Sequence, residues 1–426
     1  MREWCQLNEV AEINPDTLPG NTDNNFSFRY IHLGAVDRGT IDWNLTTATR
    51  FGDAPSRARR TVQPGDTLFG TVRPNLQSHG YIEKKHSGAT VASTGFCVVR
   101  PDQTQAIGRY LFHSLMSENI HAQSIKAAIG SNYPAITDRD LQRFNIFLPR
   151  LDEQSQIAHI LDTLDTEIRR TEEIIAKLEQ VKKGLLSDLL TRGIDENGEP
   201  RPSPEEAPHL YKTASSGRIP LTWRCSTIGE EFNIQLGKML DKEKNTGERK
   251  PYLGNKNVQW ENIDFTDLSY LRLTKAEQAK YRLKQGDLLV CEGGEVGRAA
   301  LWESQLTECY YQKALHRLRP KNDFQSALLL QFLRLWNERG FLGGQVARTS
   351  IAHLTKEKLA ALPLLAPPEP EQREIVRILN SHRRRTASER ATLASLHQLK
   401  AGLMDDLLTG RVRVTPLLKE AEQAVG

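Results

Sequence analysis

The sequence has little cysteine and no long apolar run. Cys5, Cys97, Cys225, Cys291 and Cys309 are the five cysteines of the 426 residues, and none forms a CxxC pair. This scarcity argues against a disulfide framework or a structural zinc site, and favours reduced thiols in a cytoplasm. Because no apolar stretch approaches the ~18 residues of a membrane span, and the first residues lack the apolar centre of a secretion signal, we expect a cytoplasmic protein without membrane attachment.

Common catalytic motifs are also absent. The sequence contains no GxxxxGK[ST], HExxH or GxSxG pattern, which removes the usual signatures of a phosphate-cradling loop, a zinc protease and a serine hydrolase. Neither 131–134 nor 366–369 matches the Asn/Asp-Pro-Pro-Tyr-like tetrad with which an adenine methyltransferase grips an extruded base. We therefore predict a protein that is not an enzyme and that binds no metal or cofactor itself.

One constellation leaves a nuclease open as an alternative. Asp66, Glu83 and Lys85 have the order of a metal-dependent Asp…Glu-x-Lys site, in which carboxylates hold Mg²⁺ and a lysine orients the attacking water. Gly65-Asp66 recurs as Gly286-Asp287, but no lysine follows near Glu303. The recurrence favours a turn residue of a shared framework over a catalytic acid.

The chain contains an internal repeat. From Glu153 to Thr191, 15 of 39 positions are identical to those 218 residues later, with no gap. Glu153-Gln154 recurs as Glu371-Gln372, and Asp188-Leu-Leu-Thr191 recurs as Asp406-Leu-Leu-Thr409. Fainter matches lie upstream, including Arg100-Pro101 with Arg319-Pro320, each followed by a predicted helix (109–117 and 328–337). Short β-type runs at 95–100 and 314–319 predict strands.

This repeat predicts two homologous domains and two long helices. We expect domain 1 over 1–150, helix 1 over 151–193, an extended proline-rich linker over 194–220, domain 2 over 221–367, helix 2 over 368–410 and a tail over 411–426. Apolar residues spaced alternately by four and three predict a coiled-coil seam. Its members are Ile157, Leu161, Leu164, Ile168, Ile175, Leu178, Ile375, Leu379, Leu393, Leu396 and Leu403, with a polar interruption at His382 to Arg385.

Charge supports the pairing of these helices. Residues 151–198 carry 6 basic and 11 acidic side chains, whereas 369–413 carry 9 and 6. Segments of opposite net sign attract, although two solvated helical faces remain an alternative explanation. We predict an α+β protein in which two mixed α/β domains with a curved sheet are joined by an antiparallel coiled coil with pseudo-two-fold symmetry.

The stretches between the repeated landmarks are turn-rich and basic, and they read as variable loops on a common scaffold. Arg and Lys neutralise phosphates, Arg grips guanine, and Asn or Gln grips adenine. Taken singly, each residue is better explained as an ordinary solvated surface side chain, but the paired placement of the whole set in two domains favours DNA binding. The candidates are Arg50, Arg57, Arg59, Arg60, Arg73, Asn75, Gln77, Ser131, Asn132, Tyr133, Lys238, Lys242, Lys244, Arg249, Lys256, Asn257, Gln259, Arg298, Arg348 and Ser350.

Nearly the whole chain resembles the specificity subunit of Type I restriction–modification systems. The resemblance rests on the Glu-Gln motifs, the long helices ending in Lys-x-Gly-Leu and Asp-Leu-Leu-Thr, and the Gly-Asp-x-Leu turns. It implies that each domain reads one half of a split, asymmetric DNA target, while the helices fix the gap. It also implies two methyltransferase subunits carrying S-adenosylmethionine, and restriction subunits using ATP and Mg²⁺.

Three alternatives remain at this point. The chain could be the recognition subunit of a related Type II methyltransferase–nuclease system with the same architecture. It could be a stand-alone nuclease centred on Asp66, Glu83 and Lys85, or a coiled-coil scaffold without a DNA role.

Overall fold

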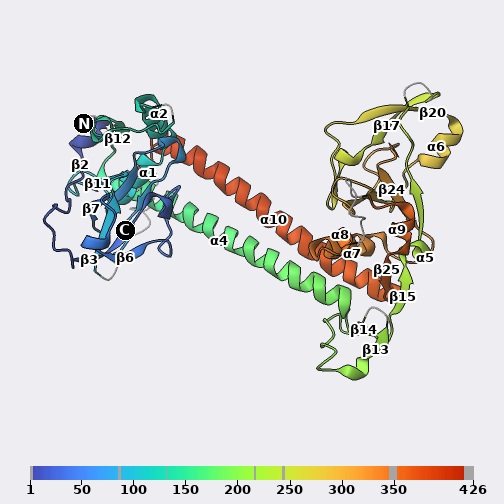
Figure 1. Ribbon diagram of the computed structural model, residues 1–426. Coiled ribbons are helices and arrows are strands. Elements are labelled where there is room, and N and C mark those ends of the chain that lie inside the picture. The colour runs from blue at the N-terminus through green and yellow to red at the C-terminus, as the bar shows by residue number, and fades with distance from the viewer. Residues whose placement is uncertain are drawn as a thin grey trace. The chain divides into compact units, whose positions relative to one another are not determined.

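The computed structural model describes residues 3–84, 88–130, 132–214, 217–241, 245–344 and 353–416. The chain divides into two compact units, Met1–Glu173 with Arg390–Gly426, and Ile174–Glu389. Each unit holds one domain and parts of the two longest helices, α4 (Leu151–Thr191, 41 residues) and α10 (Glu369–Leu407, 39 residues) (Figure 1). Within the described ranges, no helix combines the length and the apolar character that a membrane crossing requires.

In the described part of the first unit, the domain is built from short strands and three short α-helices. Its strands are β1 (Trp4–Gln6), β2 (Ala11–Ile13), β3 (Ser27–Ile31), β4 (Val36–Asp37), β5 (Thr40–Ile41), β6 (Thr47–Arg50), β7 (Ala58–Val62), β8 (Thr67–Gly70), β9 (Gly80–Tyr81), β10 (Ala89–Ser93), β11 (Phe96–Pro101) and β12 (Asn145–Phe147). Its helices are α1 (Gly108–Leu115), α2 (Glu118–Ala127) and α3 (Asp138–Gln142), with 3₁₀ turns η1 (Leu7–Glu9), η2 (Leu33–Ala35), η3 (Phe51–Asp53) and η4 (Pro74–Leu76).

The second unit repeats this plan after a hairpin. Its strands are β13 (Tyr211–Ala214), β14 (Gly217–Pro220), β15 (Arg224–Thr227), β16 (Phe232–Leu236), β17 (Glu248–Leu253), β18 (Val258–Gln259), β19 (Asn262–Ile263), β20 (Ser269–Leu273), β21 (Leu288–Cys291), β22 (Ala299–Leu301), β23 (Tyr310–Tyr311), β24 (Leu315–Pro320) and β25 (Pro363–Ala366). Its shorter helices are α5 (Ile228–Glu231), α6 (Lys275–Tyr281), α7 (Ser326–Glu338), α8 (Phe341–Gly344) and α9 (Lys356–Ala361), with η5 (Pro208–Leu210) and η6 (Asn255–Asn257).

The two domains share most of their strand topology, although the sheet β6-β3-β10-β7 is matched by the shorter sheet β20-β17-β23 among the described residues. The antiparallel sheet β2-β11-β8-β9 corresponds to β16-β24-β21-β22, and the pair β1-β12 corresponds to β15-β25. A parallel pair also recurs, as β3 with β10 and as β17 with β23. The predicted architecture of two homologous mixed α/β domains and two paired long helices is confirmed, as are the strands at β11 and β24 and the helices at α1 and α7.

In both copies of the repeat, the aspartate of the Gly-Asp turn is buried and forms an ion pair with an arginine. Gly65 and Gly286 have φ of +95° and +85°, a region that favours glycine. The following Asp66 and Asp287 are fully enclosed. Arg100 Nε and Nη2 donate to Asp66 at 2.8 and 2.9 Å, and the same atoms of Arg319 donate to Asp287 at 2.7 and 2.6 Å. Each pair ties the turn to the neighbouring strand of its sheet.

The long helices pack in antiparallel fashion within each unit. In the first, Ile157 and Leu161 near the start of α4 share a buried cluster with Leu407 and Leu408 near the end of α10. In the second, the cluster joins Leu186, Leu189 and Leu190 near the end of α4 to Ile375 and Leu379 near the start of α10. The Leu-Leu pairs of the repeated Asp-Leu-Leu-Thr motif are therefore core residues.

The seam is tightest near the domains. Ile157, Leu161, Ile168, Ile375 and Leu379 are buried, and the remaining predicted seam residues are half-buried, namely Leu164, Ile175, Leu178, Leu393, Leu396 and Leu403. His382 lies half-buried, and neither of its enclosed ring nitrogens has a hydrogen-bond partner among the described residues. Burial lowers its pKa, and the charges of Lys182 and Arg385 lower it further.

The repeated Glu-Gln motif joins each helix to its own domain. Gln154 Oε1 accepts the backbone N–H of Ile107 at 2.8 Å, and its Nε2 donates to the carbonyls of Gln105 and Pro149 at 3.0 and 2.9 Å. Gln372 makes the corresponding bonds to Gln325 and Pro367, each at 2.9 Å. Both amides are buried. Each glutamine therefore satisfies backbone groups that would otherwise be buried without partners.

The preceding glutamates hold the segment that follows the other helix. Glu153 accepts from Arg413 Nη2 at 2.7 Å and from Thr415 at 2.8 Å, while Glu371 accepts from Arg201 at 2.5 and 3.0 Å. The hydrogen bonds from Arg413 hold the pKa of Glu153 below its usual range despite burial.

The prediction of an extended linker over 194–220 is wrong. The segment contains η5 and the antiparallel hairpin β13-β14, and it buries Ile194, Tyr211 and Ile219. Ile194 and Ile219 belong to the main core cluster of the second unit together with Trp223. These apolar residues anchor a segment whose prolines and glutamates made it look extended.

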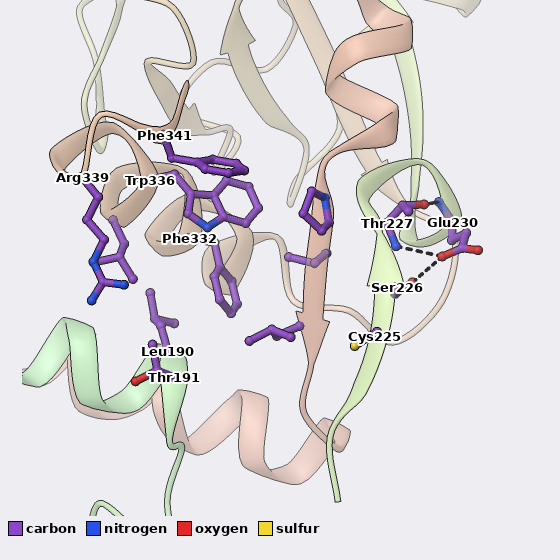
Figure 2. A pocket seen from close by; sticks show the side chains of 14 residues that line it. Leu190, Thr191, Cys225, Ser226, Thr227, Glu230, Phe332, Trp336, Arg339 and Phe341 are labelled. Carbon is purple, nitrogen blue, oxygen red and sulfur yellow. Dashed lines mark hydrogen bonds between the residues drawn. The ribbon is translucent and has the colours of Figure 1, made fainter. Parts of the chain in front are cut away.

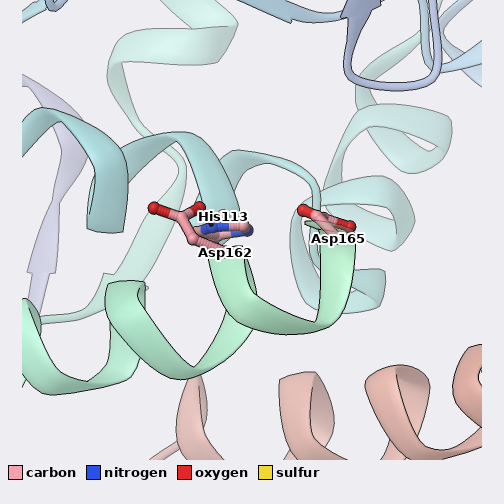
Figure 3. Close-up of side chains that lie close together, drawn as sticks. All are labelled: His113, Asp162 and Asp165. Carbon is pink, nitrogen blue, oxygen red and sulfur yellow. Dashed lines mark hydrogen bonds and ion pairs between the residues drawn. The ribbon is translucent and has the colours of Figure 1, made fainter. Parts of the chain in front are cut away.

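A polar cluster joins α1 to α4 in the first unit. Figure 3 shows His113 beside Asp162, with Asp165 about one turn further along α4. His113 Nε2 lies 2.7 Å from Asp162 Oδ1, and Arg109 Nε donates to the same oxygen at 2.6 Å. Asp165 pairs with Lys400 of α10. The three potential metal ligands lie within 4.8 Å of one another, but Arg109 and Lys400 already compensate both carboxylates, so the cluster serves as a domain–helix contact.

We expect Gln154→Leu to destabilise the first unit by about 3 kcal/mol, because it leaves up to three buried backbone groups unpaired at roughly 1–3 kcal/mol each. Urea unfolding followed by circular dichroism measures the loss, and hydrogen exchange should show faster exchange of the Ile107 amide. Gln398→Leu changes an exposed glutamine and should shift stability by less than about 0.5 kcal/mol. Equal effects of the two substitutions would contradict this role for Gln154.

We expect the stability of the first unit to fall as pH drops below about 6.5. Burial lowers the pKa of His113 and outweighs the opposing effect of its hydrogen bond to the Asp162 carboxylate, so the folded state favours the neutral ring. In the unfolded chain His113 takes up a proton near the ordinary histidine pKa of ~6.5. Because the folded state disfavours this proton, acid shifts the equilibrium toward the unfolded chain. His113→Gln introduces the residue found at the equivalent position 331. This variant should show a flatter stability profile between pH 7.5 and 5.5; an unchanged slope would contradict the assignment.

Candidate nucleic-acid interface

The predicted basic stretch of the first domain borders the sheet β6-β3-β10-β7. Arg50, at the end of β6, and Arg57, before β7, are exposed. Arg50 shares a surface hollow of about 530 Å³ with Arg29, Thr49 and Gly88. The Arg59 guanidinium stacks over Phe51 at 4.5 Å, and Arg60 pairs with Asp138 at 3.4 Å. Arg50 and Arg57 are therefore the more available cations of this group.

Two loops predicted separately in the first domain meet at Arg73 and Tyr133. The Arg73 guanidinium lies 4.4 Å over the Tyr133 ring, which is 70% exposed, and the Arg73 backbone N–H donates to Pro134 at 2.7 Å. Arg73 and Gln77, which flank η4, both have left-handed backbones, with φ of 51° and 50°. Such strain in residues other than glycine is typical of functional sites. Asn75 and Asn132 are exposed and Gln77 is half-buried.

A similar arginine–aromatic pair occurs in the second domain, on different elements. The Arg249 guanidinium of β17 lies 4.6 Å over Tyr270 of β20, whose ring is 53% exposed. Tyr270 was missed by the sequence analysis. The alternation in Ser269–Leu273, where Leu271 and Leu273 are buried, could have indicated its exposure. An exposed aromatic face beside a guanidinium is suited to stacking on a base.

The other candidates of the second domain are partly engaged within the protein. Lys238 pairs with Glu277, and Lys256 pairs with Asp267. Arg298 Nη2 donates to the carbonyl of Asn255 at 2.9 Å, and Gln259 Nε2 donates to that of Lys256 at 2.8 Å. Lys256 and Gln259 remain exposed, whereas Lys238 and Arg298 are half-buried.

The prediction that the Asn257 side chain contacts DNA is wrong. Asn257 is 2% exposed. Its Oδ1 accepts the Gly254 N–H at 2.9 Å, and its Nδ2 donates to the carbonyls of Asp264 and Asp267 at 2.9 and 3.2 Å. These bonds brace the turn between β17 and β18 from within. Ser131, Lys242, Lys244, Arg348 and Ser350 lie outside the described residues.

The geometry around Asp66 argues against a nuclease. Its carboxylate is buried and held by the two bonds from Arg100, with a third from the Gln63 N–H at 2.8 Å. Glu83 lies 3.8 Å from Arg109 instead, and Lys85 is outside the described residues. The alternative interpretation of Asp66 as a turn residue is confirmed.

A further hollow of about 510 Å³ lies in the second unit, among α7, α8, β15 and β25. Figure 2 shows Phe332, Trp336 and Phe341 along one side of it, with Thr227 and Glu230 on the other. Arg339, at its rim, donates to Ser187 at 2.8 Å. None of the DNA-binding candidates lines this hollow, and its aromatic wall suits an apolar group rather than a phosphate.

Comparisons with known proteins agree with this arrangement. A family model described as Type I restriction modification DNA specificity domain matches residues 3–180 and again 220–398. The MjaVIII specificity subunit of Methanocaldococcus jannaschii is 24% identical over 319 residues, covering 72% of this chain and 71% of that protein. The EcoKI specificity subunit of Escherichia coli is 25% identical over 333 residues, covering 74% and 67%.

Solved structures share the fold. A chain from a study of complex assembly in the type I R-M system aligns with a TM-score of 0.55 and 23% identity, covering 95% of this chain and 97% of that one. The HsdS subunit from Thermoanaerobacter tengcongensis aligns with a TM-score of 0.50 and 23% identity, covering 96% and 97%. Since the family model spans most of both repeats, this chain belongs to the Type I restriction–modification DNA specificity family, as a non-catalytic subunit that recognises DNA sequence.

Proposed function

We propose that the chain reads a two-part, asymmetric DNA target, one part with each domain, and that its paired helices set the length of the unread gap. The observation that carries this proposal is the repeat itself: most of one topology occurs twice, but the exposed arginine–aromatic pairs stand on different elements. Domains of common descent bind DNA in related ways, whereas different contacting side chains select different bases.

The proposed contacts are the exposed or half-buried candidates. In the first domain they are Arg50, Arg57, Arg59, Arg60, Arg73, Asn75, Gln77, Asn132 and Tyr133, and in the second Lys238, Arg249, Lys256, Gln259 and Arg298, with Tyr270 added. The undescribed Ser131, Lys242, Lys244, Arg348 and Ser350 remain sequence-based candidates.

Family membership implies DNA, methyltransferase and restriction subunits as partners, and no cofactor on this chain. We further propose two methyltransferase subunits that carry S-adenosylmethionine, restriction subunits that use ATP and Mg²⁺, and a cytoplasmic location. A related Type II methyltransferase–nuclease assembly is the second candidate, because the same recognition architecture would serve either set of partners.

Footprinting of the complex with its methyltransferase partner on target DNA should show two protected clusters flanking an unprotected gap. One continuous footprint would reject the two-part target. Arg73→Gln and Arg249→Gln form a matched pair, each removing one exposed guanidinium. We expect each to weaken binding by about 1–3 kcal/mol and to relax specificity in its own cluster only.

Lengthening both helices should lengthen the gap without altering either half of the target. Seven residues inserted within 169–179 of α4 and within the counterpart 387–397 of α10 add two turns, about 10 Å. At roughly 3.4 Å per base pair, the preferred gap should grow by about three base pairs. Binding to randomised targets, selected and sequenced, measures this change. A gap of unchanged length would contradict the ruler.

A further inference from the structure

The polar interruption of the second helix carries uncompensated positive charge. Arg383, Arg384 and Arg385, here called the arginine belt, are exposed on α10. Among the residues that the structure describes, none of the three has a hydrogen-bonding or ion-pair partner. Lys182 and Arg385 both lie near enough to His382 to lower its pKa, after the larger effect of burial. Positive charge is therefore concentrated here, although Lys182 is compensated in part by Glu261, which lies 3.6 Å away.

The first copy of the repeat has the opposite charge at the same positions. Asp165, Thr166 and Glu167 stand 218 residues before the belt. Asp165 pairs with Lys400, the counterpart of Lys182. The equivalent residues of the second copy, Arg383 and Lys182, are both cations and cannot form this ion pair. Lys182 lies 3.6 Å from Glu261 of the second domain instead. The belt is thus a departure from the repeat and does not serve the helix–helix contact that the first copy makes.

The belt adjoins a concave surface suited to an anion. Arg384 lines a hollow of about 470 Å³ together with Arg373 and Arg377, beside the polar side chains of Gln325, Asn380 and Ser381. Arg373 pairs with Glu369 at 2.5 Å, and Arg377 Nε donates to Glu374 at 2.7 Å. Arg384 therefore supplies the uncompensated charge of this hollow. The equivalents of its three arginines are Ser155, His159 and Thr166.

Arg383 faces a neighbouring hollow. It lines a space of about 190 Å³ with Glu261, Glu303 and Asn380, but forms an ion pair with neither glutamate. Glu261 is already bonded to Arg334 at 3.0 Å. Arg383 is therefore less suited than Arg384 to an anion from outside the chain, because two carboxylates share its hollow.

We propose that the arginine belt binds backbone phosphates of the DNA between the two half-sites, next to the half-site read by the second domain. This rests on the proposed two-part target. The belt and the second domain belong to one compact unit, so the phosphates it reaches flank that half-site. Guanidinium groups bind phosphate oxygens in bidentate geometry, and phosphate contacts position DNA without reading its sequence. Such contacts suit a stretch whose bases go unread.

The test uses the complex of the full chain with its methyltransferase partner. The variant Arg383→Gln, Arg384→Gln, Arg385→Gln retains good helix formers. The logarithm of the DNA-binding constant falls with the logarithm of salt concentration, with a slope of about −0.9 for each neutralised phosphate. Loss of three phosphate contacts should therefore make this slope shallower by roughly 2–3 in the variant. Affinity at 0.15 M salt should fall at least tenfold, with the same sequence selected.

A matched control and a change in the DNA make the test specific. Arg169→Gln with Arg170→Gln removes two exposed arginines of α4 and should leave the salt dependence unchanged. Uncharged methylphosphonates placed in the gap beside the second half-site should weaken binding of the wild-type complex but not of the triple variant. Methylphosphonates placed in the gap beside the first half-site should weaken binding of the wild-type and the triple-variant complexes equally.

Several results would overturn the belt's role. These are an unchanged salt dependence, an altered recognition sequence, or failure of the triple variant to retain its methyltransferase partner in gel filtration, which would make the belt a protein interface. Failure of the two-part target is a separate result, because it appears as a continuous footprint of the wild-type complex. A two-cluster wild-type footprint combined with identical salt dependences rejects the belt alone.

Discussion

Buried glutamines at the start of each long helix hold the architecture together. Gln154 and Gln372 bond backbone groups at the start of α1 and α7, and so fix each helix to the domain that precedes it. The other end of the same helix buries its Leu-Leu pair in the opposite unit. Each compact unit therefore contains parts of both helices. The proposed ruler requires such a fixed joint between each domain and its helix.

Buried positions of the scaffold constrain the sequence more strongly than the exposed positions proposed to contact DNA. Residues of the scaffold recur in both copies because they fill the same buried positions, as the pairs Asp66–Arg100 and Asp287–Arg319 do. Exposed positions carry no such constraint, so the arginine–aromatic pairs differ between the domains. If the target has two parts as proposed, divergence of this surface over a constant frame would allow one half to change without disturbing the other. The arginine belt extends this asymmetry to the helices themselves.

Much of the frame could be predicted, because periodicity and repetition leave signals in sequence. The three–four spacing indicated α4 and α10, and the short β-type runs at 95–100 and 314–319 indicated β11 and β24. The hairpin at β13-β14 could not be foreseen, since Ile194, Tyr211 and Ile219 are irregularly spaced among prolines and glutamates. Asn257 was misassigned because a polar residue near a turn reads as exposed until its backbone partners are known. The sequence could not show which arginines form ion pairs within the protein, because such pairs join distant segments, as Arg60 and Asp138 do.

The proposed function requires that two matched domains each read one half of a split target, and that the protein sets the distance between the halves. Sequencing methylated adenines in cells that express this chain with its partners tests it most directly, alongside a chain whose residues 1–150 come from a homologue. We predict two short motifs separated by a constant gap, of which the exchange alters one motif and leaves the other motif and the gap unchanged. A single uninterrupted motif, or an exchange that alters both parts, would contradict the account.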